Sequence, residues 1–166
     1  MKVAVYSRTF DQGFLPCIKD FFHYLNEYRF EVYVFEEFVR FLEDHFSYRP
    51  DFHGTFTGYQ DIRNDMDFVT SIGGDGTFLD TLSLVRNTGI PVIGINSGKL
   101  GFLASISKDD IKQAVSSIYH GNYTIEERSL LKIESDPQLF EGFSYALNDV
   151  TIQKKGSEMK IGRAHV

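Results

Sequence analysis

Apolar and polar residues alternate along residues 1–120 with two distinct periods. Four short apolar runs bounded by turn-forming residues predict buried strands, at Lys2–Tyr6, Phe30–Phe35, Asp67–Ile72 and Pro91–Ile95. Apolar residues spaced three or four positions apart predict helices, at Gly13–Glu27, Glu36–Asp44, Thr77–Arg86 and Asp109–Tyr119. The polar stretch 45–64 predicts a loop. This order predicts an α/β domain in which helices cover both faces of a parallel sheet.

The pattern changes after Gly121. Two longer strand-like runs, Tyr123–Ser135 and Phe143–Gln153, follow with no helix between them, and the turn-forming segment Ser135–Pro137 joins them. They predict an antiparallel pair in a second, β-rich domain over residues 121–160, with a boundary near residue 120. Because two strands are too few to be stable alone, we expect this part to lean on the first domain or to be the incomplete beginning of a larger one.

The last six residues, 161–166, interrupt the strand-like pattern. Their sequence, Ile-Gly-Arg-Ala-His-Val, matches one reading frame of a common sequencing adapter. We therefore expect the natural sequence to stop at Met159 or Lys160, and residues 161–166 to be an artefactual tail.

Composition narrows the class of protein. The 166 residues, 42% hydrophobic and 24% charged, suit a globular protein of one domain, or of one domain and part of a second. The net charge of −6 argues against a nucleic-acid partner, although backbone N–H groups can still hold a phosphate. Cys17 is the only cysteine and the histidines show no ligand spacing, so no metal site made of protein side chains is expected. Without a signal peptide or an apolar run near the roughly 18–20 residues of a membrane span, we expect a cytoplasmic protein with no membrane partner.

The motif Gly73-Gly74-Asp75-Gly76-Thr77 follows a predicted strand and opens a predicted helix. Its glycines let the backbone approach a ligand, and free N–H groups at a helix start suit a phosphate, while Thr77 is placed to cap the helix or add a hydroxyl contact. A carboxylate at Asp75 makes chemical sense there if it binds a sugar hydroxyl, or takes its proton as the hydroxyl attacks a γ-phosphate. The alternative is a tight turn with no ligand, and the motif matches neither GxGxxG nor the P-loop.

A second group of residues, Gly94–Leu103, lies at the end of the next predicted strand, where ligands bind in open α/β sheets. Asn96 offers both donor and acceptor atoms. Gly98 and Gly101 permit an irregular loop, and Phe102 offers an apolar surface for a flat ring. A plain connecting loop would also explain this segment.

Asn148 and Asp149 interrupt an otherwise apolar strand-like run, 145–152. One of the two must face inward on a pleated strand, and a buried polar side chain is costly unless it is paired. A ligand is a reasonable partner, and a bulge or an edge position is the alternative.

The three motifs in this order resemble the NAD kinase family, and the resemblance covers essentially all of residues 1–159. GGDGT alone is shared in form with diacylglycerol and sphingosine kinases. The Asn-x-Gly-x-Leu-Gly-Phe pattern at 96–102 is much more particular to NAD kinases. Lipid kinases usually continue GGDGT with Asn-Glu, where this chain has Phe78-Leu79-Asp80.

The resemblance implies ATP-dependent phosphorylation of the 2′-hydroxyl of the adenosine ribose of NAD, with a divalent cation, Mg²⁺ being expected. NAD and ATP would be the small-molecule partners, and the full-length protein would form a homo-oligomer. Asp75 would meet the ribose hydroxyl as base or orienting group. The remaining implied roles are the phosphate side (Gly73, Gly74, Gly76, Thr77), NAD contacts (Gly76, Phe102 near the adenine, Asn148 and Asp149 at the ribose) and loop support (Asn96, Gly98, Gly101). Position 149 is more often Glu in the family, and Asp has a slightly shorter reach.

The family completes its site with a β-rich second domain that contains a Thr-Pro-Thr-Gly-Ser-Thr-Ala-Tyr-like segment. This sequence has no such segment, so we expect the chain as written to bind NAD weakly and to be inactive. Two alternatives stay open. A diacylglycerol- or sphingosine-type lipid kinase would bind vesicles, and a non-catalytic nucleotide-binding module would keep its role after Asp75→Asn.

Overall fold

The computed structural model of the chain describes residues 1–62, 65–98, 101–134, 143–147, 149–153 and 161–165. It divides into two compact units, Met1–Thr124 and Ile125–Val166, each of which is described by itself below.

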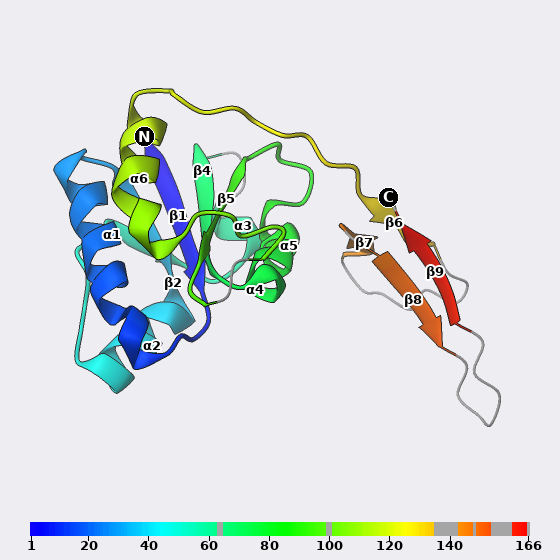
Figure 1. Ribbon diagram of the computed structural model, residues 1–166, viewed down its shortest axis with the longest axis horizontal. Coiled ribbons are helices and arrows are strands. Elements are labelled where there is room, and N and C mark those ends of the chain that lie inside the picture. The colour runs from blue at the N-terminus through cyan, green and yellow to red at the C-terminus, as the bar shows by residue number, and fades with distance from the viewer. Residues whose placement is uncertain (63–64, 99–100, 135–142, 148, 154–160, 166) are drawn as a thin grey trace. The chain divides into compact units, whose positions relative to one another are not determined.

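A five-stranded parallel sheet forms the centre of the first unit (Figure 1). Its strands are β1 (Lys2–Ser7), β2 (Glu31–Phe35), β3 (Gly54–Phe56), β4 (Phe68–Gly73) and β5 (Val92–Asn96). They lie in the order β3-β2-β1-β4-β5, and all four neighbouring pairs are parallel. Strands covered by helices on both faces are buried along their length, and every residue of β4 and every residue of β1 after Lys2 is buried. The predicted α/β class and the four predicted strands are confirmed.

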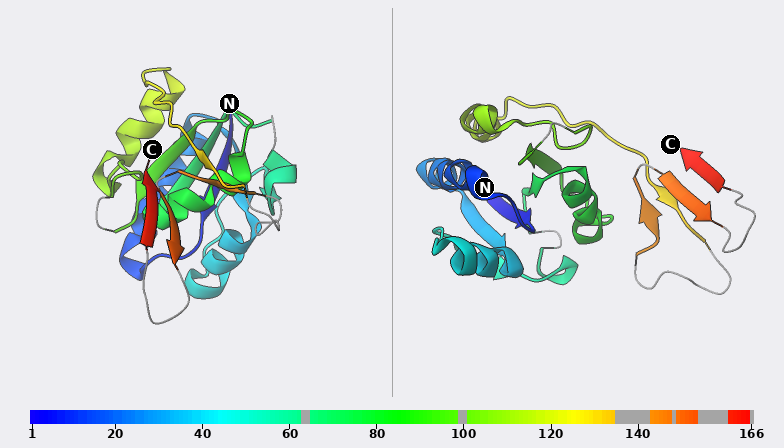
Figure 2. Two further views of the ribbon diagram at one scale, coloured as in Figure 1. Left: turned by 90° about the vertical axis from the view of Figure 1, so that its right-hand side faces the viewer. Right: turned by 60° about the horizontal axis from the view of Figure 1, so that its bottom comes forward.

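Helices cover both faces of this sheet (Figure 2). The helical elements are η1 (Gln12–Phe14), α1 (Leu15–Glu27), α2 (Glu36–Phe46), α3 (Tyr59–Ile62), α4 (Asp75–Asp80), α5 (Leu82–Val85), η2 (Lys108–Asp110) and α6 (Ile111–Tyr119). Helices α1, α2 and α6 bury their apolar stripes against one face, and α3 and α5 pack on the other. The sequence therefore predicted the layers of this unit correctly.

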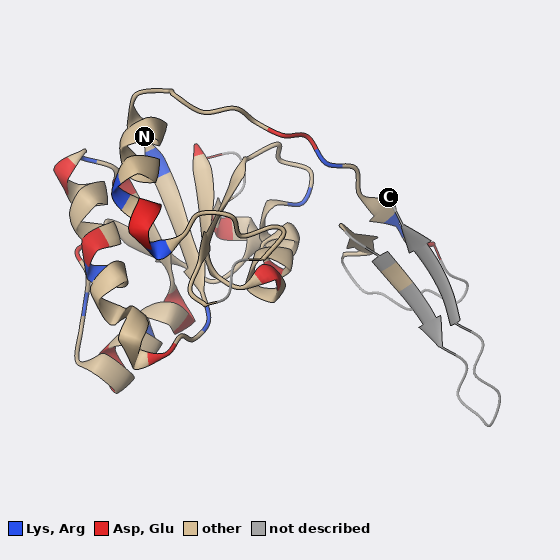
Figure 3. Cartoon of the chain, viewed as in Figure 1, with Lys and Arg blue, Asp and Glu red and all other residues tan. Residues whose placement is uncertain are grey.

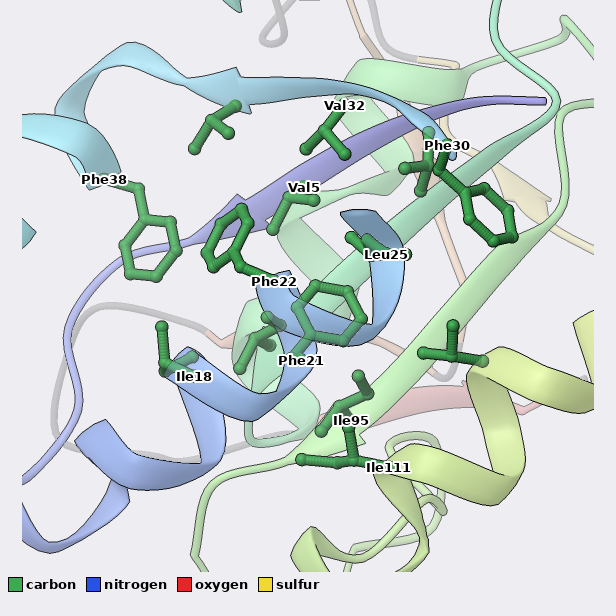
Figure 4. Close-up of a cluster of buried hydrophobic side chains, with 14 of the residues drawn as sticks. Val5, Ile18, Phe21, Phe22, Leu25, Phe30, Val32, Phe38, Ile95 and Ile111 are labelled. Carbon is green, nitrogen blue, oxygen red and sulfur yellow. The ribbon is translucent and has the colours of Figure 1, made fainter. Parts of the chain in front are cut away.

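The larger core cluster lies under α1, α2 and α6 (Figure 4). In α1 the buried residues are Ile18, Phe21, Phe22 and Leu25, which is the three-and-four spacing of one helical face. Phe22 and Phe38 are almost fully buried against the sheet. Charged residues instead gather on helices and loops, and the five sheet strands carry charge only at Lys2 and Glu31 (Figure 3).

The stretch 45–64 is wrong as a simple loop, because it contains β3 and α3. Both elements are short, three and four residues, and such lengths show no apolar period. Phe56 and Ile62 are nevertheless buried in the second core cluster.

The helix predicted at Thr77–Arg86 begins earlier and is divided. It starts at Asp75 and breaks into α4 and α5 at Thr81. There the hydroxyl of Thr81 donates to the carbonyl of Phe78 at 2.6 Å, so a side chain competes for a backbone acceptor. The predicted helix at 109–119 is confirmed, with η2 as its first turn.

The second unit has shorter strands than predicted. In place of two long runs, β6 (Leu131–Lys132) and β7 (Tyr145–Ala146) form a short antiparallel pair. Residues 123–129 are exposed and lie outside any strand. β8 (Asp149–Gln153) pairs antiparallel with β9 (Ile161–His165), so the segment expected to interrupt the pattern has strand backbone.

Candidate functional site

The candidate site begins where β1, β4 and β5 end at their carboxyl edge. Gly73 at the end of β4 pairs with Asn96 at the end of β5, and Ser7 at the end of β1 pairs with Ile72. The strand order reverses direction between β1 and β4. In doubly wound sheets, ligands bind outside the carboxyl ends of the strands at such a point.

The glycine-rich turn is packed too tightly for a side chain at its first position. A Cβ at Gly73 would lie 2.6 Å from Cβ of Thr77, because the threonine folds back over the turn. Gly74 is the residue before α4, and the carbonyl of Gly74 accepts the N–H of Phe78 at 3.1 Å. Thr77 therefore lies inside α4 and does not cap it, so the first of its two expected roles is wrong.

Asp75 is held by the backbone of a distant loop. Its Oδ2 accepts the N–H of Phe102 at 2.9 Å, and its Oδ1 accepts the N–H groups of Leu103 and Ala104 at 3.0 and 3.1 Å. The Phe102 N–H above all holds the pKa of the Asp75 carboxyl below its usual range, with help from the other two N–H groups. Asp75 is therefore an ionised acceptor at neutral pH.

Gly101 allows the loop to approach Asp75 this closely. A Cβ on Gly101 would lie 2.6 Å from Cγ and 2.7 Å from Oδ2 of Asp75. Any other residue would push the carboxylate and the loop apart. The sequence indicated only that Gly101 permits an irregular loop, and the structure shows which side chain it accommodates.

Asn96 closes the same loop at its base. It is 4% exposed, its Oδ1 accepts the N–H of Gly98 at 2.7 Å, and its Nδ2 donates to the carbonyl of Ala104 at 3.4 Å. The chain then returns along β5, where the N–H of Asn96 donates to the carbonyl of Ile106 at 2.8 Å. Asn96 is thus committed to the loop's own backbone.

Phe102 stands beside this carboxylate with its side chain in solvent. The residue is 94% exposed, more than any other large hydrophobic residue described. Its backbone is fixed through Asp75, yet its ring has almost no protein around it. Such a ring is available to stack on a flat ligand.

The third motif lies in the second unit. Asn148 is outside the described residues. Asp149 is the first residue of β8, and its side chain is outside the described part of the structure. The structure therefore brings together Asp75, Gly101 and Phe102, and does not test a contact between them and the Asn-Asp pair.

Arg8 lies at the same edge of the sheet, although the sequence did not indicate it as a site residue. It follows β1 directly, and its Nε donates to Oδ2 of Asp80 at 2.9 Å and to the hydroxyl of Tyr6 at 3.2 Å. The available signal was its position, since residues after neighbouring parallel strands share one edge.

Among the described residues, no group of three His, Cys, Asp or Glu side chains is arranged to hold a metal ion. No helix in the described ranges is long and apolar enough to cross a membrane.

Comparison with known proteins decides the family. Residues 11–123 match the ATP-NAD kinase N-terminal domain, which covers the whole sheet except β1 and includes the Asp75 turn and its loop. The chain belongs to the NAD kinase family. The resemblance of the chain to that family is thereby confirmed.

The curated NAD kinases that this chain matches are longer than the chain. An NAD kinase of Flavobacterium johnsoniae is 35% identical over 163 residues, which is 97% of this chain and 55% of that protein. An NAD kinase of Bacteroides fragilis is 37% identical over 162 residues, again 97% of this chain and 54% of the relative. The chain thus spans about half the length of the curated relatives it matches.

A solved structure shares the fold. Yeast NADH kinase, solved in complex with NADH, superposes with a TM-score of 0.73 at 22% sequence identity. The match covers 95% of this chain and 47% of that one. At this identity the comparison supports the α/β architecture.

Proposed function

We propose that the protein containing this chain is an NAD kinase that transfers the γ-phosphoryl group of ATP to NAD, giving NADP and ADP. The 2′-oxygen of the adenosine ribose attacks the γ-phosphorus, a new O–P bond forms, and the bond to the β-phosphate oxygen breaks. The hydroxyl proton leaves toward an acceptor or solvent as the bond forms. Family membership and the state of the Asp75 carboxylate together support this proposal.

The observation that carries the proposal is one unfilled acceptor position on Asp75. An ionised carboxylate has about four lone-pair sites, two on each oxygen. Among the described residues, Oδ1 accepts two N–H groups, whereas Oδ2 accepts only that of Phe102. Oδ2 thus has room for one further donor, which suits a single ribose hydroxyl.

The lowered pKa of Asp75 bears on how it would act. A general base works best when its pKa is near the working pH. The loop N–H groups lower the pKa of the Asp75 carboxyl and so move it further from that range. We therefore assign Asp75 first to orienting the hydroxyl and stabilising the positive charge that develops on it. Proton transfer completes as the nucleophilic oxygen becomes more acidic during attack.

Further residues have proposed roles around this acceptor. Gly74 and Gly76 are exposed with open space where a Cβ would be, and we place the phosphates against them and against Gly73 and Thr77. Phe102 would carry the adenine, and Gly76 would also contact NAD. Asn96, Gly98 and Gly101 would shape the loop, and Asn148 and Asp149 would bind the ribose.

ATP would enter as its magnesium complex. The described residues offer no cluster of three metal-ligating side chains, and three of about four acceptor sites of Asp75 are already filled. The cation would therefore be held mainly by the polyphosphate, whose charge it neutralises. We further propose a cytoplasmic homo-oligomer.

The test uses a chain of full length. Residues 1–160 of the present sequence are fused to the C-terminal portion of the Flavobacterium johnsoniae relative that follows the position aligned with Lys160. Purified chimera is supplied with NAD and magnesium ATP, and NADP is measured. We expect NADP formation, and we expect Asp75→Asn to lower turnover about 10²- to 10⁴-fold.

Asp61→Asn is the matched control. Asp61 also accepts a backbone N–H, that of Thr57 at 2.7 Å, but it lies at α3 and has no proposed role in the reaction. We expect it to leave turnover unchanged. NAD binding without NADP formation would favour a non-catalytic nucleotide-binding module, and phosphorylation of diacylglycerol in vesicles would favour a lipid kinase, which the relatives do not support.

A further inference from the structure

Three successive N–H groups at residues 102–104 converge on one carboxylate. Such a concave run of backbone donors is a binding site for an anion. Here the anion is a side chain of the same unit, Asp75, from 27 to 29 positions earlier in the chain. The loop is therefore fixed to the glycine-rich turn by a charge-assisted contact.

Phe102 depends on this contact for its position. A ring that is 94% exposed has almost no packing to hold it, so only its backbone can set where it lies. That backbone donates to Oδ2 of Asp75, while Asn96 donates to the carbonyl of Ala104 in the same run of residues. One hydrogen bond thus joins the Asp75 carboxylate to the backbone that carries the exposed ring.

We propose that Asp75 is a positioning residue for Phe102 in addition to its role as hydroxyl acceptor, and that Gly101 is required because only a glycine there admits the carboxylate. One carboxylate would then set the spacing between the hydroxyl-binding point and the ring-stacking surface. The ligand assigned to the ring rests on the proposed function. The positioning itself does not, because it concerns contacts within the unit.

The proposal changes what Asp75 variants should do. A carboxylate that acts only on the hydroxyl affects turnover and leaves nucleotide affinity nearly intact. A carboxylate that also places Phe102 affects affinity as well. Gly101→Ala should then weaken affinity although the carboxylate is still present, since the added Cβ would lie 2.6 Å from Cγ of Asp75.

The direct test is amide hydrogen exchange of Phe102, Leu103 and Ala104, followed by NMR on the chain Met1–Val166. In Asp75→Ala all three amides should exchange about 10- to 100-fold faster, the loss expected for hydrogen bonds to a charged group. In Asp75→Asn the Phe102 amide should respond most, because one side-chain oxygen remains for the other two. The amide of fully buried Ala4 in β1 reports whether the fold is intact.

Gly13→Ala is the matched control for Gly101→Ala. Gly13 lies in η1, outside the loop, and an added Cβ there would meet no described atom within 4 Å. We expect Gly101→Ala to accelerate exchange at 102–104 and Gly13→Ala to leave it unchanged. Unchanged exchange at Phe102 in both Asp75→Ala and Gly101→Ala, with Ala4 still protected, would overturn the proposal.

Kinetics of the chimera supply the second readout. Asp75→Asn should raise KM for NAD as well as lower kcat. Gly101→Ala should raise KM by about tenfold, which is the effect of losing one hydrogen bond to a charged group that orders the loop. Phe102→Ala should raise KM while leaving the exchange of Leu103 and Ala104 unchanged. Faster exchange in a chimera that makes no NADP would leave the positioning intact and refute the proposed function. A fall in kcat alone in Asp75→Asn, with normal amide exchange, would support the proposed function and refute the positioning of Phe102.

Discussion

Asp75 illustrates how much one residue's surroundings decide. From the sequence, a carboxylate in a phosphate-binding turn makes sense only if it meets a hydroxyl. The structure adds that three N–H groups reach it first and that, among the described residues, one acceptor position on Oδ2 is left. The same contacts that keep the carboxyl ionised also limit what it can bind.

The lowered pKa of Asp75 gives a prediction for stability against pH. A carboxyl whose folded pKa lies below its unfolded value, about 3.9, stabilises the fold above that value. The contribution is lost as pH falls through the lower folded pKa. The difference in the free energy of unfolding between wild type and Asp75→Asn should therefore be full at pH 7 and shrink below about pH 4, as measured by urea unfolding. A difference that stays constant down to pH 2 would contradict this assignment.

At the scale of elements, β1 and β4 are joined by more than their ladder. The hydroxyl of Ser7 donates to the carbonyl of Ile72 at 2.7 Å, inside the core. Ser71, one residue away on β4 and 1% exposed, has a hydroxyl with no hydrogen-bond partner in the described structure. Two buried serines on paired strands thus differ in whether their hydroxyls are satisfied.

Replacing each serine by alanine should separate these cases. Ser7→Ala loses a buried hydrogen bond and leaves the β4 carbonyl short of a donor, so the free energy of unfolding should fall by about 1–2 kcal/mol. Ser71→Ala removes an unsatisfied polar group and should be neutral or stabilise by up to about 1 kcal/mol. Thermal and urea unfolding of the two variants measure this difference. Equal destabilisation by both substitutions would contradict the prediction.

Local pattern identified the long elements and failed on the short ones. The strands β1, β2, β4 and β5 and the helices α1, α2 and α6 were predicted because burial imposes a regular period on many residues. β3 and α3 carry too few residues to show a period, although Phe56 and Ile62 are buried. The break between α4 and α5 depends on one hydroxyl of Thr81, which no apolar pattern reveals.

At the scale of the molecule, the first unit contains its own core. All five parallel strands and both clusters of buried apolar side chains lie within Met1–Thr124. The second unit has short antiparallel strand pairs, and isolated pairs of this kind are marginal in water. Stability should therefore reside in the first unit.

Met1–Thr124 alone should fold. We expect a cooperative thermal transition and strand and helix signals by circular dichroism, with a midpoint within a few degrees of that of the whole chain. The comparison is made on both proteins under the same buffer. A fragment without a cooperative transition would show that the first unit depends on the residues after Thr124.

Sequence by itself determined the layers of the first unit, the family and the residues on which the chemistry was expected, because these depend on local apolar periods and on short runs such as 73–77 and 96–102. It also placed Asp75 and Phe102 at neighbouring strand ends. Only the tertiary structure decided that Asp75 holds Phe102 and that Gly101 makes room for the carboxylate. The physical reason is that the donors are backbone N–H groups, which every residue but proline carries, so no sequence pattern records which of them a distant carboxylate will meet.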